Sequence, residues 1–163
     1  MLRRKVISTP FLPMVLISDG NHLIKSDFLY NDENHPRYED VVLEDNPILT
    51  ETARQLDEYF QFQRTDFDLP LLLEGTDFQR SVWDVLQAIP FGEVLTYKEI
   101  AEQAGSPKGF RAAGGACRAN PFTVIVPCHR VLSTAGAYTG YAGGKIFMKE
   151  NLLDFESGKR GLF

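Results

Sequence analysis

The sequence predicts a mixed α/β protein of the α+β type, with a small β-rich N-terminal domain (residues 1–74) and a helical C-terminal domain (residues 75–163). Short apolar segments alternate with turn residues through the first thirty positions, which is typical of short β-strands. After residue 75, apolar side chains recur at helical spacing. Two of the expected helices follow each other across a short turn, which is the pattern of a helix-turn-helix. A chain of 163 residues is long enough for two such domains.

Three strands are expected in the N-terminal domain, over Lys5–Ser8, Met14–Ile17 and Leu23–Leu29. The proline, glycine, serine and asparagine residues between these segments favour turns. The stretch 31–45 is acidic and polar, and we expect it to be a loop. A helix is expected to begin at Pro47 with Asn46 as its N-cap, because proline is favoured at the first helical position. The apolar run 69–73 is expected to be another strand or an extended linker.

Capping boxes mark the beginning of the first two helices of the C-terminal domain. Thr76 with Gln79, and Thr96 with Glu99, each place a hydroxyl three residues before a side chain that can reach back to the backbone. The proline-containing segment 90–92 is expected to end the first of these helices.

The third helix of this domain is expected over about residues 107–119, with Ser106 as N-cap and Pro107 at the first position. It contains Gly114 and Gly115, and a glycine inside a helix costs about 1 kcal/mol relative to alanine. It also carries alanines and two arginines. A helix that is small and basic can lie close to another backbone, which is either a neighbouring protein segment or a sugar-phosphate strand.

A cysteine and a histidine are adjacent in the sequence Pro127-Cys128-His129-Arg130, directly after the apolar run 122–126. We expect that run to be a short extended strand, which the proline ends. A thiolate is far more nucleophilic than a thiol, and a neighbouring base makes it available near neutral pH. The last helix, expected over Ile146–Glu156, offers three carboxylates that could orient the histidine: Glu150, Asp154 and Glu156.

On these residues alone, Cys128 is a nucleophile, a metal ligand or a buried and inert thiol. A zinc site usually needs about four ligands at paired spacing. The chain has two cysteines, eleven residues apart, and three histidines, without a C-x2-C pair, so we expect no metal. A Cys-His-carboxylate set fits an enzyme with an activated thiol, of which a cysteine hydrolase is one kind.

Charge is distributed unevenly along the chain, whose net charge is −5. Residues 1–75 contain 7 basic and 14 acidic residues, a charge of −7, and residues 76–163 contain 10 basic and 8 acidic residues, a charge of +2. The half that carries Cys128 is therefore free to approach a polyanion. Two cysteines fit a reducing cytosol better than a secreted scaffold, and without an apolar run of about 20 residues we expect no membrane partner.

The residues from Gly75 to Glu156 resemble the O6-alkylguanine-DNA alkyltransferases, also called methylated-DNA–protein-cysteine methyltransferases. The resemblance is centred on Pro127-Cys128-His129-Arg130-Val131. Further motifs follow the order and spacing of that family: Gly75-Thr76-Asp77-Phe78-Gln79, Val82-Trp83, Ile89-Pro90-Phe91-Gly92-Glu93, Thr96-Tyr97, Pro107-Lys108, Arg111-Ala112, Asn120-Pro121 and Gly140-Tyr141. Residues 1–74 match only in their β-rich character.

The resemblance implies a ribonuclease-H-like N-terminal domain and a winged-helix-like C-terminal domain. It implies direct reversal of DNA damage, in which one alkyl group moves irreversibly from O6-alkylguanine to the protein's own cysteine; O4-alkylthymine is an open second substrate. The implied partner is double-stranded DNA, bound through its minor groove with the damaged base flipped out. The implied protein is a monomer that needs no cofactor and acts in the cytoplasm, or in the nucleus of a eukaryote.

The resemblance also implies roles for individual residues. The implied catalytic residues are the nucleophile Cys128, the base His129 (acting through a water), the orienting carboxylate Glu156 and the structural asparagine Asn120. The implied base-pocket residues are Tyr97, Val131, Tyr141, Ala142 and Lys149, and Tyr97 would help to protonate the leaving guanine. The implied DNA-binding residues are Arg111, Ala112, Gly114, Gly115 and Arg118, of which Arg111 would fill the gap left by the flipped nucleotide.

Two other functions remain open at this point. Relatives that sense alkyl lesions without repairing them lack the cysteine, so Cys128 favours an enzyme. A cysteine hydrolase would also need an oxyanion hole, which the sequence does not reveal. The leading hypothesis is therefore a protein whose cysteine is consumed by one alkyl transfer, because a thioether is a stable product.

Overall fold

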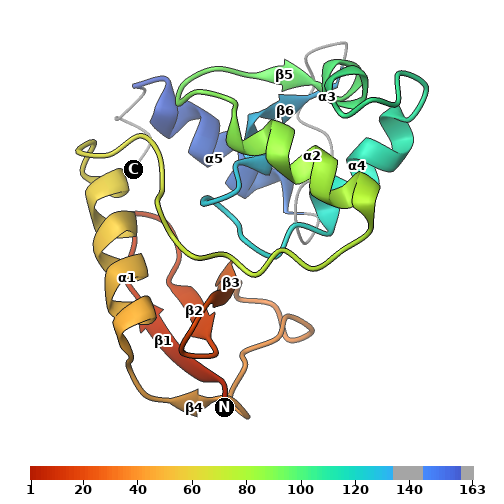
Figure 1. The fold of residues 1–163 in the computed structure, drawn as a ribbon. Coiled ribbons are helices and arrows are strands. Elements are labelled where there is room, and N and C mark those ends of the chain that lie inside the picture. The colour runs from red at the N-terminus through yellow and green to blue at the C-terminus, as the bar shows by residue number, and fades with distance from the viewer. Residues whose placement is uncertain (134–144, 159–163) are drawn as a thin grey trace. The chain divides into compact units, whose positions relative to one another are not determined.

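The computed structural model describes residues 1–133 and 145–158 (Figure 1). The chain divides into two compact units, Met1–Leu73 and Glu74–Phe163. The first unit contains a four-stranded sheet and a long helix, and the second contains the shorter helices that follow. Within the described ranges, no helix is long and apolar enough to cross a membrane.

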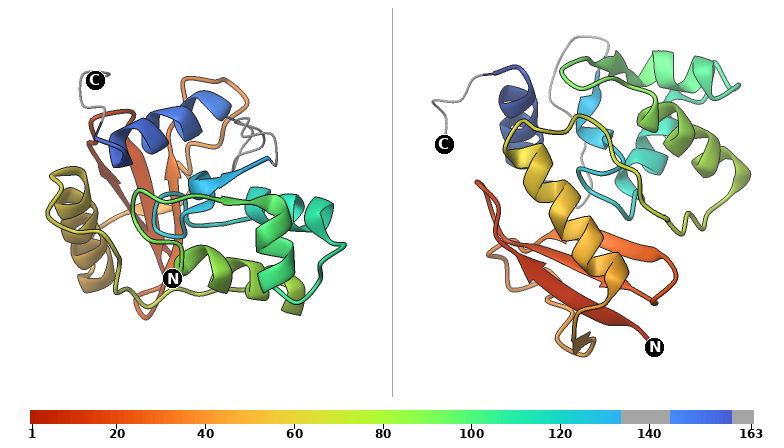
Figure 2. Two further views of the ribbon diagram at one scale, coloured as in Figure 1. Left: turned by 90° about the horizontal axis from the view of Figure 1, so that it is seen from above. Right: turned by 60° about the vertical axis from the view of Figure 1, so that its left-hand side comes forward.

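The sheet of the first unit has the strand order β3-β2-β1-β4. Its strands are β1 (Arg3–Ile7), β2 (Met14–Ser18), β3 (Leu23–Phe28) and β4 (Val42–Leu43). The first three are antiparallel neighbours, whereas β4 pairs in parallel with β1. Every residue of β2 is buried, because this strand lies inside the sheet and helix α1 (Pro47–Phe60) packs across it (Figure 2).

The three predicted strands and the predicted helix of this unit are confirmed to within two residues. Asn46 caps α1, since its side chain accepts a hydrogen bond from Leu49 N at 2.9 Å. The run 69–73 is extended, and Leu71 forms an isolated bridge with Leu23. β4 lies in the segment expected to be a loop. It is two residues long and its side chains are exposed, so the sequence has no apolar alternation that would predict it.

The second unit contains the helices α2 (Asp77–Gln87), α3 (Tyr97–Gln103), α4 (Phe110–Arg118) and α5 (Ile146–Glu156), the 3-10 turn η1 (Cys128–Arg130), and the short parallel strands β5 (Leu95–Thr96) and β6 (Val131–Leu132). α2, α3 and α4 pack on one another (Figure 1). η1 packs against α5. Both predicted capping boxes are present, at Thr76 and at Thr96. The predicted helix-turn-helix corresponds to α3 and α4.

Trp83 joins α2 to α4. Its side chain is buried, and its indole Nε1 donates a hydrogen bond to the carbonyl oxygen of Ala116 at 2.9 Å. Gly75 borders the same ring, and a Cβ at that position would lie 2.7 Å from it, so a larger residue would force a shift. This contact fixes the inner side of α4 and leaves its outer side for other partners.

α4 begins at Phe110, three residues later than the sequence predicts. Gly109 occupies the N-cap position without a side-chain hydrogen bond. Ser106 instead begins a turn, in which Gly109 N donates to Ser106 O at 2.8 Å. Proline is favoured at the second position of a turn as well as at the first position of a helix. The Ser106-Pro107 pair is therefore an ambiguous signal, and here it marks the turn.

The apolar run 122–126 forms buried turns, so the predicted strand is wrong. Val126 N donates to Phe122 O at 2.9 Å, and Val124 has a positive φ of 74°. Phe122, Val124 and Val126 are at most 1% exposed. A short run that is buried on all sides is apolar whatever its backbone conformation. Its periodicity therefore does not distinguish a strand from a series of turns.

Candidate active site

Asn120 holds the segment that presents Cys128. Its Nδ2 donates to Val126 O at 2.8 Å and to Phe122 O at 3.3 Å, and its Oδ1 accepts from Phe122 N at 2.9 Å. The same Nδ2 lies 3.3 Å from Cys128 Sγ. These bonds satisfy buried backbone groups that a sheet would otherwise satisfy, which explains how this segment is buried without being a strand.

Cys128 lies where several elements of the second unit meet. It is the first residue of η1 and is 1% exposed, and its backbone N donates to Val126 O at 2.8 Å. η1 packs against α5, and β6, which follows it, packs against α3. This topology places residues from the ends of α3 and α5 beside a cysteine that is distant from them in sequence.

Glu156, in the last turn of α5, is the acceptor at the centre of the site. His129 Nε2 lies 2.7 Å from its Oε2, Arg130 donates to both of its oxygens at 2.7 and 2.9 Å, and Gly92 N donates to Oε1 at 3.3 Å. Burial opposes ionisation of Glu156, but the hydrogen bonds from His129 and Arg130 and the positive charge of Arg130 outweigh it and hold its pKa well below the ordinary value. The carboxylate is therefore ionised at neutral pH.

The hydrogen bond to Glu156 fixes the proton on His129. An ionised carboxylate only accepts, so Nε2 of the imidazole is the donor, and in the neutral ring the lone pair lies on Nδ1. Burial lowers the pKa of His129, and Glu156 offsets this only in part, so the neutral ring is favoured. Nδ1 is buried and has no hydrogen-bond partner among the residues described. His129 therefore presents a proton acceptor in the interior.

Tyr97 and Lys149 form a second polar group of the site. Lys149 Nζ donates to Tyr97 Oη at 3.2 Å and lies 5.3 Å from the centroid of its ring. Burial lowers the pKa of Lys149 to about 8, against the opposing effect of Cys128 and Cys117. Burial also raises the pKa of Tyr97, and the two thiols add to that effect. Tyr97 is therefore a neutral phenol that can donate a hydrogen bond, and Lys149 interacts with Cys128.

Two residues without a predicted role also belong to this site. Cys117, on the buried side of α4, interacts with Cys128, and burial and this interaction both raise its pKa, so it stays a thiol. Arg130 also donates through Nη1 to Ile89 O at 2.6 Å, and its guanidinium lies 5.8 Å from the Phe91 ring centroid. Arg130 is part of the cysteine motif, but the sequence alone does not show that its charge is buried.

The predicted DNA-binding residues lie on α4, and all but one of them are at least partly accessible. Arg111, Ala112 and Arg118 are exposed and Gly115 is half-buried. Positions 111, 115 and 118 follow helical spacing, so they share one face of the helix. Gly114 is different, because it is buried and a Cβ there would lie 3.9 Å from the Tyr97 ring. It serves the packing of α4 on α3 rather than an outer surface.

The predicted base-pocket residues are described only in part. Tyr97 and Lys149 are hydrogen-bonded to each other, and Val131 is buried in β6, where it pairs with Leu95 of β5. Tyr141 and Ala142 lie outside the described residues.

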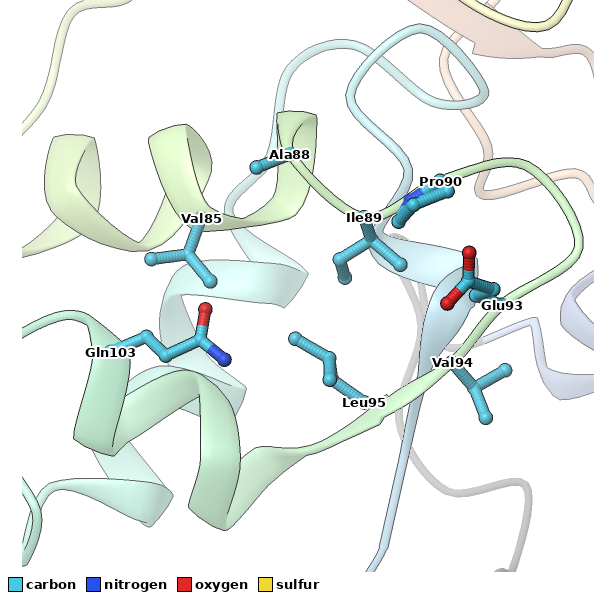
Figure 3. Close-up of a pocket in the computed structure, with 8 residues that line it drawn as sticks. All are labelled: Val85, Ala88, Ile89, Pro90, Glu93, Val94, Leu95 and Gln103. Atoms are coloured by element: carbon cyan, nitrogen blue, oxygen red, sulfur yellow. The ribbon is translucent and has the colours of Figure 1, made fainter.

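A pocket of about 220 Å³ lies between the end of α2, α3 and β5 (Figure 3). The side chains of Val85, Leu95 and Gln103 converge on it. Its lining residues include none of the predicted catalytic residues. Ile89 is its link to the site, because Arg130 donates to the carbonyl oxygen of that residue.

A buried cysteine with a histidine and a carboxylate, in the same unit as a helix-turn-helix, defines a class of protein that combines thiol chemistry with a nucleic-acid-binding architecture. Comparison with known proteins identifies the family. Residues 77–158 match the family described as 6-O-methylguanine DNA methyltransferase, DNA binding domain, and residues 2–73 match its ribonuclease-like domain. The chain belongs to the 6-O-methylguanine DNA methyltransferase family.

Similar proteins span nearly the whole chain. A methylated-DNA–protein-cysteine methyltransferase of Methanosarcina barkeri is 44% identical over 151 residues, which are 93% of this chain and 94% of that protein. The crystal structure of the Mycobacterium tuberculosis O6-methylguanine methyltransferase is 39% identical, with a TM-score of 0.86 over 97% of this chain and 94% of that one. The M. tuberculosis protein in complex with DNA gives a TM-score of 0.82 at 40% identity, over 97% of this chain and 93% of that one.

Proposed function

We propose that this protein repairs DNA by transferring the alkyl group of O6-alkylguanine to Cys128, once and irreversibly. The observation that carries the proposal is two buried hydrogen-bonded pairs, Asn120 with Cys128 and His129 with Glu156, inside a DNA-binding domain of this family. Relatives that match over more than nine tenths of both chains carry the name methylated-DNA–protein-cysteine methyltransferase. That name describes transfer to a protein cysteine.

The first step is removal of the thiol proton. His129 presents the lone pair of Nδ1, and a water between Sγ and Nδ1 would carry the proton from Cys128 to the imidazole. Glu156, kept ionised by Arg130, stabilises the imidazolium that forms. The buried ammonium of Lys149 and the Asn120 amide stabilise the thiolate.

The second step is an in-line displacement at the alkyl carbon. A bond forms between Sγ of Cys128 and this carbon as the bond from the carbon to O6 breaks, so the electron pair of that bond goes to the guanine. Tyr97 donates its phenolic proton to the leaving base, and the ammonium of Lys149, hydrogen-bonded to Tyr97, can return a proton to the phenolate. The proton taken from Cys128 stays on His129 until solvent removes it. The products are a thioether and an intact guanine, and one chain repairs one lesion.

Access to the base requires that it leaves the duplex. We propose that the accessible face of α4 lies in the minor groove, where Arg111 fills the gap and Ala112, Gly115 and Arg118 line the contact. Val131, Tyr141 and Ala142 would border the flipped base. We assign catalysis and DNA binding to residues 75–163 of a monomer, and we place the protein in a reducing compartment such as the cytosol, because Cys128 must stay a free thiol.

The test is the mass of the intact protein after incubation with a duplex that contains O6-methylguanine. We expect a gain of about 14 Da, one methyl for one hydrogen, on Cys128. The Cys128→Ser variant should gain nothing, and the matched Cys117→Ser variant should still react. Tight binding without a mass change would instead identify a lesion sensor, and many turnovers per chain would identify a hydrolase.

A further inference from the structure

Phe110 is an exposed aromatic residue at the beginning of α4. It is the first residue of the helix and is 51% exposed, although a phenyl ring normally gains from burial. The next residue is Arg111, whose guanidinium carbon lies 5.9 Å from the centroid of the Phe110 ring. An aromatic ring in contact with an exposed arginine, on a helix with a second exposed arginine, is a combination that nucleic-acid-binding surfaces use for stacking.

We propose that Phe110 is a second wedge, which enters the minor groove with Arg111 and packs against the base step opened by flipping. This inference rests on the proposed function and adds a positioning residue to it. Apolar side chains inserted between base steps unstack them, and the cost is offset when surface that was exposed in the free protein becomes buried. Phe110 offers such surface at the end of α4 next to Arg111.

The contact between the two side chains also prepares Arg111 for insertion. A free arginine side chain has many rotamers, and ordering it on binding costs conformational entropy. The Phe110 ring restricts the guanidinium to one region through their cation–π contact. Phe110 therefore acts before insertion by ordering Arg111, and during insertion by stacking beside it.

The experiment measures single-turnover alkylation of Cys128 with two substrates, a duplex containing O6-methylguanine and free O6-benzylguanine. For Phe110→Ala we expect a duplex rate reduced about tenfold, since stacking of one aromatic ring on a base changes affinities by roughly that factor. The rate with the free base should stay at the wild-type value. Phe110→Tyr should restore the duplex rate to within about twofold, because it keeps the aromatic face.

A matched control removes exposed apolar surface elsewhere. Leu43, on β4 of the first unit, is 65% exposed, and Leu43→Ala should leave both rates unchanged. Arg111→Ala combined with Phe110→Ala should be little slower on duplex DNA than Arg111→Ala alone, because the two residues act as one unit. Fully additive losses would overturn joint insertion.

Two results would overturn the role of Phe110 itself. One is a duplex rate of Phe110→Ala equal to wild type. The other is an equal loss with both substrates, which would make Phe110 a structural residue of α4. Neither result touches the proposed function, which is tested separately by whether wild-type Cys128 is alkylated by the duplex, once per chain.

Discussion

The charge balance of the site depends on Glu156. Two buried side chains that carry or can acquire positive charge, Arg130 and His129, share its carboxylate. A buried ion that loses its partner is strongly destabilising, whereas the intact pair contributes little net stability. The arrangement is therefore better explained by its effect on His129 than by stability, because it fixes the proton on Nε2 and leaves Nδ1 as the acceptor.

Replacing Glu156 with glutamine tests this balance. We expect Glu156→Gln to lower the free energy of unfolding by about 3 kcal/mol, since Arg130 is left without a buried counter-charge. Alkyl transfer should be about 100-fold slower at neutral pH, and its rate should rise at higher pH than in wild type, because the imidazolium loses its stabilising charge. Urea unfolding and single-turnover kinetics between pH 5 and 10 measure the two effects.

The pH dependence of the stability loss has a definite sign. The folded pKa of Glu156 is depressed, so its contribution is fully present above the ordinary value of 4.5 and is lost as the pH falls through the folded pKa. Wild type and Glu156→Gln should therefore converge in stability below pH 4.5. Glu150 lies exposed on the same helix, and Glu150→Gln is the control that should change neither stability nor rate. An unchanged pH–rate profile in Glu156→Gln would remove Glu156 from the mechanism.

Lys149 is a buried amine whose positive charge lowers the stability of the folded protein. Its folded pKa of about 8 is below the ordinary 10.5, so the cost of burying its charge is present below pH 8 and decreases as the pH rises from 8 to 10.5. The difference between 10.5 and about 8 corresponds to roughly 3.5 kcal/mol, at about 1.4 kcal/mol per pKa unit. We expect Lys149→Met to raise the free energy of unfolding at pH 7 by less than this, about 2 kcal/mol, because the hydrogen bond to Tyr97 is lost with the amine.

The same variant should transfer alkyl groups more slowly. Without the ammonium, both the thiolate and the Tyr97 donor lose a stabilising charge, and we expect the rate to fall at least tenfold at pH 7. The stability gain should shrink above pH 8, which thermal unfolding at pH 7 and pH 10 would show. A variant that is less stable than wild type at pH 7 would contradict a net cost of burying the Lys149 charge.

At the scale of elements, the sequence predicts the features that depend only on residues close together in the chain. Asn46, Thr76 and Thr96 cap their helices as expected, because a cap needs only neighbouring residues. The two-residue strands β5 and β6 are not predictable in this way, since each exists only through its partner from a distant part of the chain. The turns of the run 122–126 depend likewise on the Asn120 side chain, whose importance came from family resemblance and not from pattern.

The two glycines of α4 separate packing from DNA contact. A Cβ at position 114 would make ordinary contacts with Arg118 at 3.6 Å and Tyr97 at 3.9 Å, and one at position 115 would lie 4.0 Å from Arg118. Both Gly114→Ala and Gly115→Ala should therefore fit and stabilise the protein by up to about 1 kcal/mol through helix propensity. Only the methyl group of Gly115→Ala lies on the face shared with Arg111.

Repair rates then discriminate between the two positions. Gly115→Ala should slow the repair of duplex DNA several-fold while leaving the reaction with free O6-benzylguanine intact, because only the duplex must approach the helix backbone. Gly114→Ala serves as its matched control, with the same added methyl group on the buried side. Equal duplex rates in the two variants would mean that α4 does not approach DNA through this face.

At the scale of the whole molecule, opposite charges are divided between the two halves of the chain. Residues 1–75 carry −7 and residues 76–163 carry +2. A polyanion is repelled by the first and only weakly attracted by the second, so the electrostatic part of DNA binding must come from a small number of exposed basic residues. The sequence alone predicts this division of charge. Because Arg130 and Lys149 are buried, however, the +2 of residues 76–163 overstates the number of cations that can contact phosphates.

The salt dependence of duplex binding follows from the number of exposed basic residues that contact phosphates. With Arg118 and two neighbouring lysines as phosphate contacts, the slope of log K against log salt should be about −3, since each contact contributes roughly −0.9. Arg118→Ala should reduce the slope by about 1 and weaken binding to every sequence alike. Arg54→Ala, which removes an exposed cation from α1 of the acidic half, should leave the slope unchanged. Fluorescence anisotropy from 50 to 300 mM salt measures the duplex affinity of wild type, Arg118→Ala and Arg54→Ala. A slope unaffected by Arg118→Ala would place the phosphate contacts on another surface than α4.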